Sequence, residues 1–209
     1  MFIKLTLFCF IFFIAELAEV KTLSTLEKVL NSYVKSSGLK IYLLKKEAQT
    51  LLGTKSTHKA YLYVKYKKIK LSYLKPKKVD IIFNKKDLWI INKKSIKYTN
   101  KKSLWSQIPI IQLFSLNLDL KNYFFIRWKE DKAGVRTYRL RARLASLKNK
   151  IKDFKIVINI LTKQIIKISY KDDIDNKMEY KFLKTKFKQK IKDSFFNFKP
   201  KKTDRVINL

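Results

Sequence analysis

A strict alternation of apolar and charged residues limits the fold of this chain more than any other feature of its sequence. Between Val135 and Leu144, arginines separate apolar side chains that occupy every second position, namely Tyr138, Leu140, Ala142 and Leu144. Successive side chains of a β-strand point to opposite faces, so this pattern predicts a strand with one buried and one solvated face. The same period recurs in Lys155 to Ile160 and in Ile165 to Lys171.

The connections between these predicted strands are short and polar. They are Asp131 to Gly134, Leu161 to Gln164 and Asp172 to Asn176. A parallel crossover needs roughly a dozen residues or more, whereas a few residues are enough to join antiparallel neighbours. The carboxy-terminal half is therefore predicted to be an antiparallel meander.

Two helices are predicted to accompany the sheet. Ser24 to Glu27 has the pattern of a capping box, and apolar residues follow at helical spacing as far as Val34. We expect this helix to end at Ser36 to Gly38, with the glycine in a left-handed cap, before strand-like sequence begins at Leu39. A second, very apolar helix is expected within Ser106 to Leu116, where Pro109 suits the first helical turn. The Thr54 to Lys59 stretch is expected to be a loop.

The amino terminus is typical of a secretory signal peptide. Lys4 precedes an apolar run of about 11 residues, Leu5 to Ala15, whereas a membrane span needs about 20 residues. The predicted organisation is a signal peptide over residues 1–18 and one domain over residues 19–209. The expected location is the periplasm, with an uncleaved amino-terminal anchor as the alternative.

Composition argues against catalytic and metal chemistry. The only cysteine, Cys9, lies inside the predicted signal peptide, and the only histidine is His58. There is no glycine-rich phosphate loop, and the aspartates between Asp172 and Glu179 lack the glycine of a calcium loop. We therefore predict a binding protein with no catalytic residues, no metal and no cofactor.

The formal net charge of +33 favours anionic partners such as acidic lipid or polysaccharide. Biased codon usage is the competing explanation, because the lysines are spread along the whole chain. Export argues against nucleic acid as the partner.

Several motifs resemble those of one family in order and spacing. They are the helix Leu26 to Val34, the strands of Tyr61 to Tyr73 before Pro76, the hairpin Asn84 to Ile91 with a lysine in place of a glycine, the triplet Ile96 to Tyr98, the proline-led segment Pro109 to Phe114, and the closing pair Phe196 to Pro200 and Asp204 to Ile207. Over nearly the whole chain, this arrangement is similar to the LolA family of periplasmic carriers of outer-membrane lipoproteins.

The resemblance implies a mainly β, α+β fold: an antiparallel half-open β-barrel with an α-helical lid, as in LolA and LolB. It implies an apolar cavity for acyl chains, for which we predict the wall residues Leu71, Tyr73, Ile81, Phe83, Leu88, Ile90, Tyr138, Leu140, Ile156, Ile158, Ile166 and Ile168. The predicted lid residues are Leu26, Leu30, Ile110, Ile111, Leu113 and Phe114. Lys65 stands where the family has an arginine that latches the lid, and a shift of one residue would place Tyr66 there.

The function implied is that of a monomeric carrier, not an enzyme, which shields the acyl chains of lipoproteins between the two membranes. A transporter of the inner membrane would supply the lipoprotein and a receptor of the outer membrane would accept it. Two alternatives remain open from the residues themselves. One is a basic envelope-binding module with a solid core, bound to anionic lipid or polysaccharide; the other is a glycan hydrolase with unassigned carboxylates.

Overall fold

A computed structural model describes residues 25–101, 109–115, 120–148 and 150–209. The predicted signal peptide, with Cys9, and the flanks of the second predicted helix lie outside these residues. Within them, no helix is long and apolar enough to cross a membrane.

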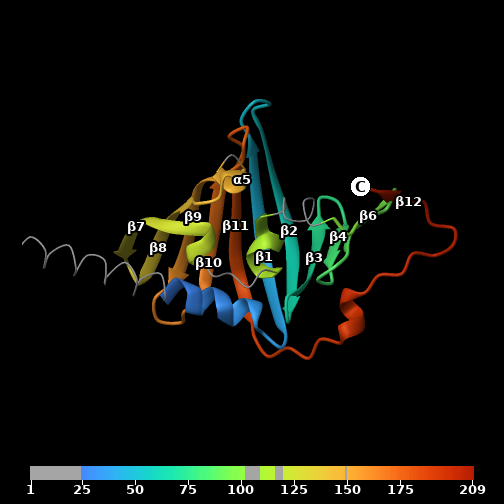
Figure 1. Ribbon diagram of the computed structural model, residues 1–209, viewed down its shortest axis with the longest axis horizontal. Coiled ribbons are helices and arrows are strands. Elements are labelled where there is room, and N and C mark those ends of the chain that lie inside the picture. Colours follow the sequence, from blue (N-terminus) through green and yellow to red (C-terminus); the bar gives the residue numbers. More distant parts are fainter. Residues whose placement is uncertain (1–24, 102–108, 116–119, 149) are drawn as a thin grey trace, which may run out of the picture.

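Twelve strands form one continuous sheet in the order β12-β6-β5-β4-β3-β2-β1-β11-β10-β9-β8-β7 (Figure 1). Their bounds are β1 Leu39–Gln49, β2 Thr54–Lys65, β3 Lys68–Lys75, β4 Val79–Phe83, β5 Leu88–Asn92, β6 Ile96–Thr99, β7 Phe124–Lys132, β8 Val135–Ala142, β9 Lys152–Asn159, β10 Ile165–Lys171, β11 Lys177–Lys186 and β12 Val206–Asn208. All neighbours are antiparallel except β6 and β12, which are parallel. Strands β12 and β7 end the sheet without pairing to each other, so it is curved but not closed.

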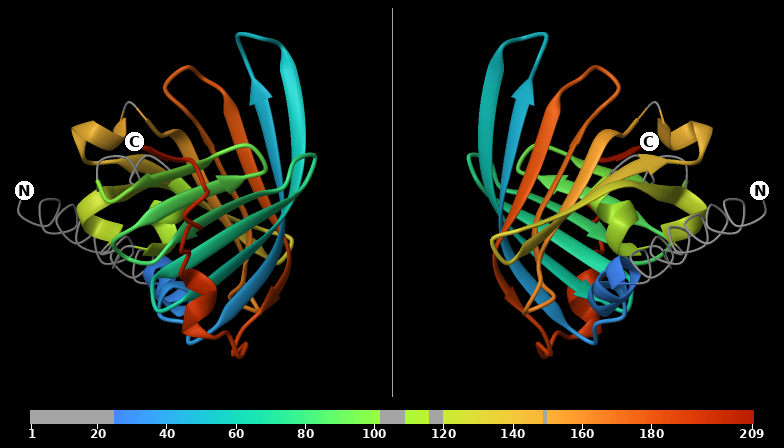
Figure 2. Two further views of the ribbon diagram at one scale, coloured as in Figure 1. Left: turned by 90° about the vertical axis from the view of Figure 1, so that its right-hand side faces the viewer. Right: turned by 90° about the vertical axis from the view of Figure 1, so that its left-hand side faces the viewer.

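The helical segments lie on the concave side of this sheet. Residues 25–34 form a helix along its base, and α3 (Pro109–Ser115) lies across its middle (Figure 2). Short turns of helix, α4 (Leu120–Tyr123) and α5 (Ala145–Lys148), flank β7 and β8. A 3-10 helix, η1 (Asp193–Phe196), belongs to the C-terminal segment that leads from β11 to β12 on the other side. The predicted mainly β, half-open architecture with helices over one face is therefore confirmed.

Side chains of Asn and Asp stabilise the hairpins of a chain that has only three glycines. Asn84 Oδ1 accepts hydrogen bonds from the backbone N–H groups of Lys86 and Asp87, at 3.2 and 2.9 Å. Lys85, beside it, has a φ of 85°, in the region that favours glycine. This lysine occupies the position at which the family motif has a glycine. Asp172 organises the β10–β11 turn by accepting bonds from the N–H groups of Ile174 and Asn176.

Three local expectations need correction. A bulge in β10, between Ile165 and Lys167, moves Ile165 into the core and leaves Ile166 half-buried. Leu144 follows the end of β8 and is exposed, because the alternation outlasts the pairing by two residues. Residues 54–59 belong to β2 and are not a loop, because they pair with β1 along their whole length.

The first helix ends at Val34, and Gly38, four residues later, is not the expected left-handed cap. Its φ is not in the left-handed region, in contrast to those of Gly53 and Gly134. Instead, a Cβ at Gly38 would lie 1.8 Å from the carbonyl oxygen of Gln189. The Gln189 N–H donates to the Gly38 carbonyl oxygen at 2.9 Å. The glycine is therefore required for close approach of the C-terminal segment to the base of the sheet.

Candidate functional site

The concave face of the sheet is a continuous apolar surface. One row crosses five strands through the successive pairs of Ile41, Leu62, Leu71, Ile81 and Ile90. On the other side of β11, Ile168 pairs with Ile156, which in turn pairs with Tyr138. The strands alternate as the sequence predicts, so the concave face collects apolar side chains, whereas the convex face carries lysines and arginines together with several aromatic residues.

The helix of residues 25–34 and α3, together called the lid here, cover this face. All six predicted lid residues are buried in one hydrophobic cluster with side chains of the sheet. Phe114 joins the layers, because its ring centroid lies 5.9 Å from that of Tyr33 in the first helix and 6.3 Å from that of Phe182 in β11. Phe114 therefore packs α3 against both the first helix and the sheet.

Tyr33 fixes the first helix to the sheet with a polar contact as well. Its hydroxyl accepts a hydrogen bond from the Ile165 N–H at 2.8 Å, and its ring meets the edge of Phe187 at 5.1 Å. Burial raises the pKa of this hydroxyl above its ordinary value. The first helix thus has a specific anchor on β10, at the position of the bulge.

Most of the predicted wall residues come together in the same cluster. Its buried members are Leu71, Phe83, Leu88, Tyr138, Leu140, Ile156, Ile158 and Ile168, and Tyr73 and Ile81 pack against them with partial exposure. Ile90 and Ile166 are half-buried and lie outside the cluster as described. Phe114, Leu62 and Tyr138 are all 0% exposed, so protein atoms fill the space beside them. In this structure, the helix of residues 25–34 and α3 therefore occupy the concave face.

The sequence prediction omitted the central strands. Residues Leu39, Ile41, Leu43, Ala60, Leu62, Val64, Ile69, Tyr180 and Phe182 are buried on the same face. Their alternation in Leu39–Leu43 and Ala60–Val64 is as regular as that of β8 and would have identified them.

Polar groups occupy the end of the concave face that lies farthest from the first helix. Tyr170 and Tyr180 stack with ring centroids 6.5 Å apart, and burial raises the pKa values of both, that of Tyr170 to about 12. Lys45 Nζ and Glu47 Oε2 form an ion pair at 2.7 Å. The His58 ring lies 5.7 Å from that of Tyr73, and burial followed by the Lys45 charge lowers its pKa.

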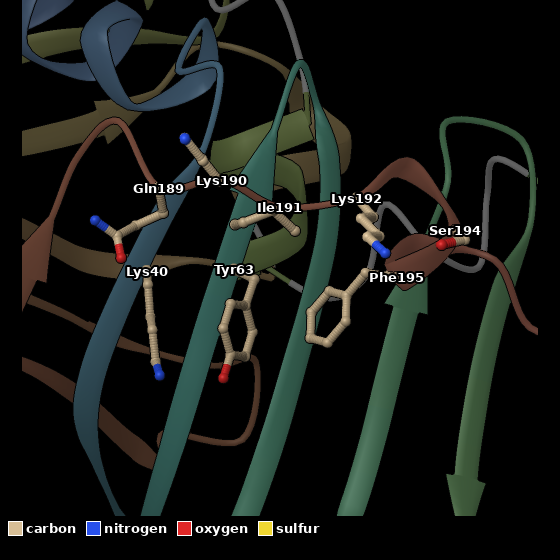
Figure 3. A pocket seen from close by; sticks show the side chains of 8 residues that line it. All are labelled: Lys40, Tyr63, Gln189, Lys190, Ile191, Lys192, Ser194 and Phe195. Carbon is tan, nitrogen blue, oxygen red and sulfur yellow. The ribbon is translucent and has the colours of Figure 1, made fainter.

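The convex face carries a different surface, which is basic and aromatic. A groove of about 460 Å³ runs between β1–β2 and the C-terminal segment, lined by Lys40, Tyr63, Gln189, Lys190, Ile191, Lys192, Ser194 and Phe195 (Figure 3). A smaller groove of about 240 Å³ shares Lys40 and Gln189 with it and adds Tyr42, Tyr61, Lys184 and Lys186. Lys40 Nζ lies 4.5 Å from the ring centroid of Tyr61, a cation–π distance. The larger and the smaller groove together are called the convex groove here.

Lys65 has partners other than the predicted lid. Its Nζ donates to the backbone oxygen of Ile191 at 2.7 Å and lies 3.1 Å from Asp193 Oδ1. In the described part of the chain, it therefore fastens the C-terminal segment to the base of β2, because that segment crosses the sheet where β2 ends. Tyr66, the alternative latch, is 52% exposed in the β2–β3 turn.

Replacing Lys65 by methionine should loosen this attachment. A hydrogen bond from a charged donor contributes about 1.5–3 kcal/mol, so amide hydrogen exchange over residues 189–196 should rise roughly 10–150-fold. Lys68→Met is the matched control, because Lys68 Nζ lies 3.4 Å from the same carboxylate and has similar exposure, whereas the bond to the Ile191 oxygen belongs to Lys65. An equal effect of both substitutions would contradict a specific role of the bond to Ile191.

The described residues contain no group of three or more His, Cys, Asp or Glu side chains that could hold a metal ion. The side chains that meet on the concave face are mostly apolar, and polar groups lie only at one end of that face.

Comparison with known proteins agrees with this geometry. The family model for the outer membrane lipoprotein carrier protein LolA matches residues 62–199. None of the curated proteins is similar enough in sequence to count as a relative.

Solved structures show the same fold at low sequence identity. An uncharacterised conserved protein from Thermus thermophilus has a TM-score of 0.54 and 9% identity, over 88% of this chain and 97% of its own. A DUF1329 family protein from Desulfovibrio piger has a TM-score of 0.52 and 11% identity, over 86% and 97%. Because the family match spans more than half of the sequence, the chain belongs to the LolA family, whose description is that of a carrier protein.

Proposed function

We propose that this protein is a carrier that binds the acyl chains of lipoproteins against its concave face and moves them between the inner and outer membranes. The observation that supports this proposal most directly is the single apolar cluster that joins the lid to the curved sheet. Burial contributes about 0.8 kcal/mol per methylene, so an acylated protein leaves a membrane at a useful rate only if another apolar surface receives its chains.

In this proposal, acyl chains replace the lid side chains on the concave face. Phe114 and its neighbours on α3 contact the sheet through apolar surface, and an acyl chain would present surface of the same kind. Exchanging one apolar contact for another changes the buried area little, so the closed lid competes with the ligand without excluding it. Opening and closing of α3 would then couple uptake to release.

The polar end of the concave face fits the other part of such a ligand. Lys45, His58 and the Tyr170–Tyr180 pair offer donors and acceptors beside the apolar wall. Ester and amide groups join the acyl chains to the lipoprotein, and they need hydrogen-bond partners when they leave water. We assign this end to the junction between acyl chain and protein.

The cellular setting is part of the same proposal. Residues 1–18 would be the cleaved signal peptide and residues 19–209 the single carrier domain of the periplasm. The monomer would receive lipoproteins from an inner-membrane transporter and deliver them to an outer-membrane receptor.

The test uses vesicles that contain a peptide acylated on its amino-terminal cysteine. After incubation with the protein, the peptide should appear in the supernatant as a complex, whereas the same peptide without acyl chains should not bind. Ile81→Gln, on the concave face, should weaken this extraction roughly tenfold, because a half-buried contact to the ligand is lost. Leu74→Gln is the control, since Leu74 is 36% exposed on the opposite face.

Equal binding of acylated and non-acylated peptide would contradict the carrier proposal. That result would favour a second candidate function, because the convex groove brings the side chains of several lysines together with half-buried tyrosines. That surface suits an anionic envelope polymer. Salt separates the two functions: binding through solvated lysines should fall steeply with ionic strength, and acyl binding should persist.

A further inference from the structure

The hairpin of β1 and β2 ends in two strongly exposed leucines. These strands are the longest pair of the sheet, and their turn projects past the rest of the molecule (Figures 1 and 2). Leu51 is 78% exposed and Leu52 is 72% exposed at this turn. These two adjacent leucines therefore do not contribute to the hydrophobic core, and packing within the chain does not explain why apolar residues stand at this turn.

The neighbouring hairpin of β10 and β11 holds this turn in place. The Thr50 N–H donates to Asn176 Oδ1 at 3.0 Å, and the Thr50 hydroxyl donates to the Asp175 carbonyl oxygen at 2.7 Å. The second turn adds Ile174, which is 53% exposed. Leu51, Leu52 and Ile174 thus form one apolar projection built from two joined turns, called the leucine tip here.

Lysines surround the leucine tip on both hairpins. Lys46 and Lys55 lie on the β1–β2 hairpin, and Lys171 and Lys177 lie on the β10–β11 hairpin. The acidic groups nearby are engaged in part: Glu47 pairs with Lys45, Asp172 accepts backbone bonds in its own turn, and Asp175 lies 3.5 Å from Lys152 Nζ. Asp173 is the remaining acidic residue of the turn. The four lysines outnumber the three aspartates Asp172, Asp173 and Asp175 by one, so the tip is weakly positive on a chain whose formal net charge is +33.

We propose that the leucine tip inserts into the headgroup region of a lipid bilayer that contains anionic lipid. A narrow convex projection buries little area against another protein, for which a stable interface needs about 800 Å² per partner. A fluid bilayer interface closes around a projection of any shape, takes up leucine side chains and places its acidic headgroups beside lysines. This inference is independent of acyl binding on the concave face, although it would set the polar end of that face toward the membrane.

A site-specific fluorescent label tests the insertion in the full chain. Cys9→Ser removes the native thiol, and Leu52→Cys then carries an environment-sensitive dye at the tip. Vesicles of phosphatidylethanolamine with phosphatidylglycerol should shift the dye emission to the blue. The same dye at Leu161→Cys should not respond, because Leu161 is 86% exposed in the β9–β10 turn at the opposite end of the strands.

Binding of charge-substituted variants provides the second measurement. Leu51→Asp with Leu52→Asp should raise the lipid concentration needed for the blue shift of a dye at Ile174→Cys roughly tenfold or more. Leu161→Asp should leave it unchanged, and equal melting temperatures would show that all variants are folded.

Two results would overturn the proposal. One is a dye at position 52 that stays in water while the protein is bound to vesicles. The other is a response that salt abolishes and the aspartate substitutions do not change, since that would mean adhesion through lysine charge alone. Neither result depends on whether acylated peptides are extracted, so the two proposals can fail separately.

Discussion

Replacing Phe114 by alanine should increase the affinity of the protein for acyl chains. Phe114 is fully buried between Tyr33 and Phe182, and it holds α3 on the concave face. A Phe→Ala substitution in a core costs about 3–5 kcal/mol, and this cost falls on the closed position of the lid. Because an open lid has already lost that contact, the equilibrium moves toward the conformation that binds ligand.

The expected effect is large. A shift of about 3 kcal/mol in the lid equilibrium raises the apparent affinity by up to roughly 100-fold, provided that the closed lid dominates in the wild-type protein. Titration of a fluorescent long-chain fatty acid would measure it, with thermal unfolding recorded in parallel. The melting temperature should fall, so affinity and stability should change in opposite directions.

Phe195→Ala is the matched control for this experiment. Phe195 lies on the convex side, is 36% exposed and contacts Tyr63 with ring centroids 4.8 Å apart. Its removal should leave acyl affinity unchanged. If Phe114→Ala instead bound more weakly, the side chain would be a wall of the site, and α3 would not be a competing lid.

Gly38→Ala should destabilise the base of the protein strongly. The new Cβ would lie 1.8 Å from a backbone oxygen of Gln189, which cannot move aside as the end of a flexible side chain could. Overpacking of this kind costs about 1–3 kcal/mol or more. For a chain of this length, the melting temperature should fall by roughly 3–10 °C. The bond from the Gln189 N–H to the Gly38 oxygen should be lost, and the convex groove should change shape.

Gly53→Ala is the control that distinguishes the cost of a steric clash from the cost of an unfavourable backbone conformation. No atom lies within 4 Å of a Cβ at Gly53, but its φ is 62°. An alanine there should cost about 1 kcal/mol through the left-handed conformation alone. Calorimetry should show a larger loss of unfolding free energy for Gly38→Ala than for Gly53→Ala. Equal losses would mean that the backbone of Gln189 can shift to accommodate the new Cβ at little cost.

Local pattern was sufficient to predict the carboxy-terminal meander, because period and turn chemistry act over few residues, but it misassigned residues 54–59 of β2 as a loop. The bounds of β10 and the turns on either side of it follow directly from alternation and short polar connections. The bulge that exchanges Ile165 for Ile166 could not be predicted in this way, since it depends on how β10 pairs with β9.

Long-range contacts account for the remaining differences at the site. Lys65 binds a carbonyl 126 residues away in sequence, and nothing in the local sequence indicates which segment crosses the end of β2. The sequence predicts Gly38 as a left-handed helix cap, whereas the glycine is needed because the backbone of Gln189, distant in sequence, packs directly against it. In contrast, burial of the four apolar residues in Pro109–Phe114 follows from the local sequence, because so dense an apolar segment is stable only when it is removed from water.

The pairing of β1 with β11 sets an order on biosynthesis. Residues Leu39–Gln49 form the centre of the sheet with Lys177–Lys186, so these neighbours are separated by most of the chain. A polypeptide that emerges amino terminus first, from a ribosome or a translocation channel, cannot complete its middle until almost all of it has emerged. Contacts of such high sequence separation also slow folding. The β1–β11 ladder is therefore among the last parts of the sheet that can form during synthesis.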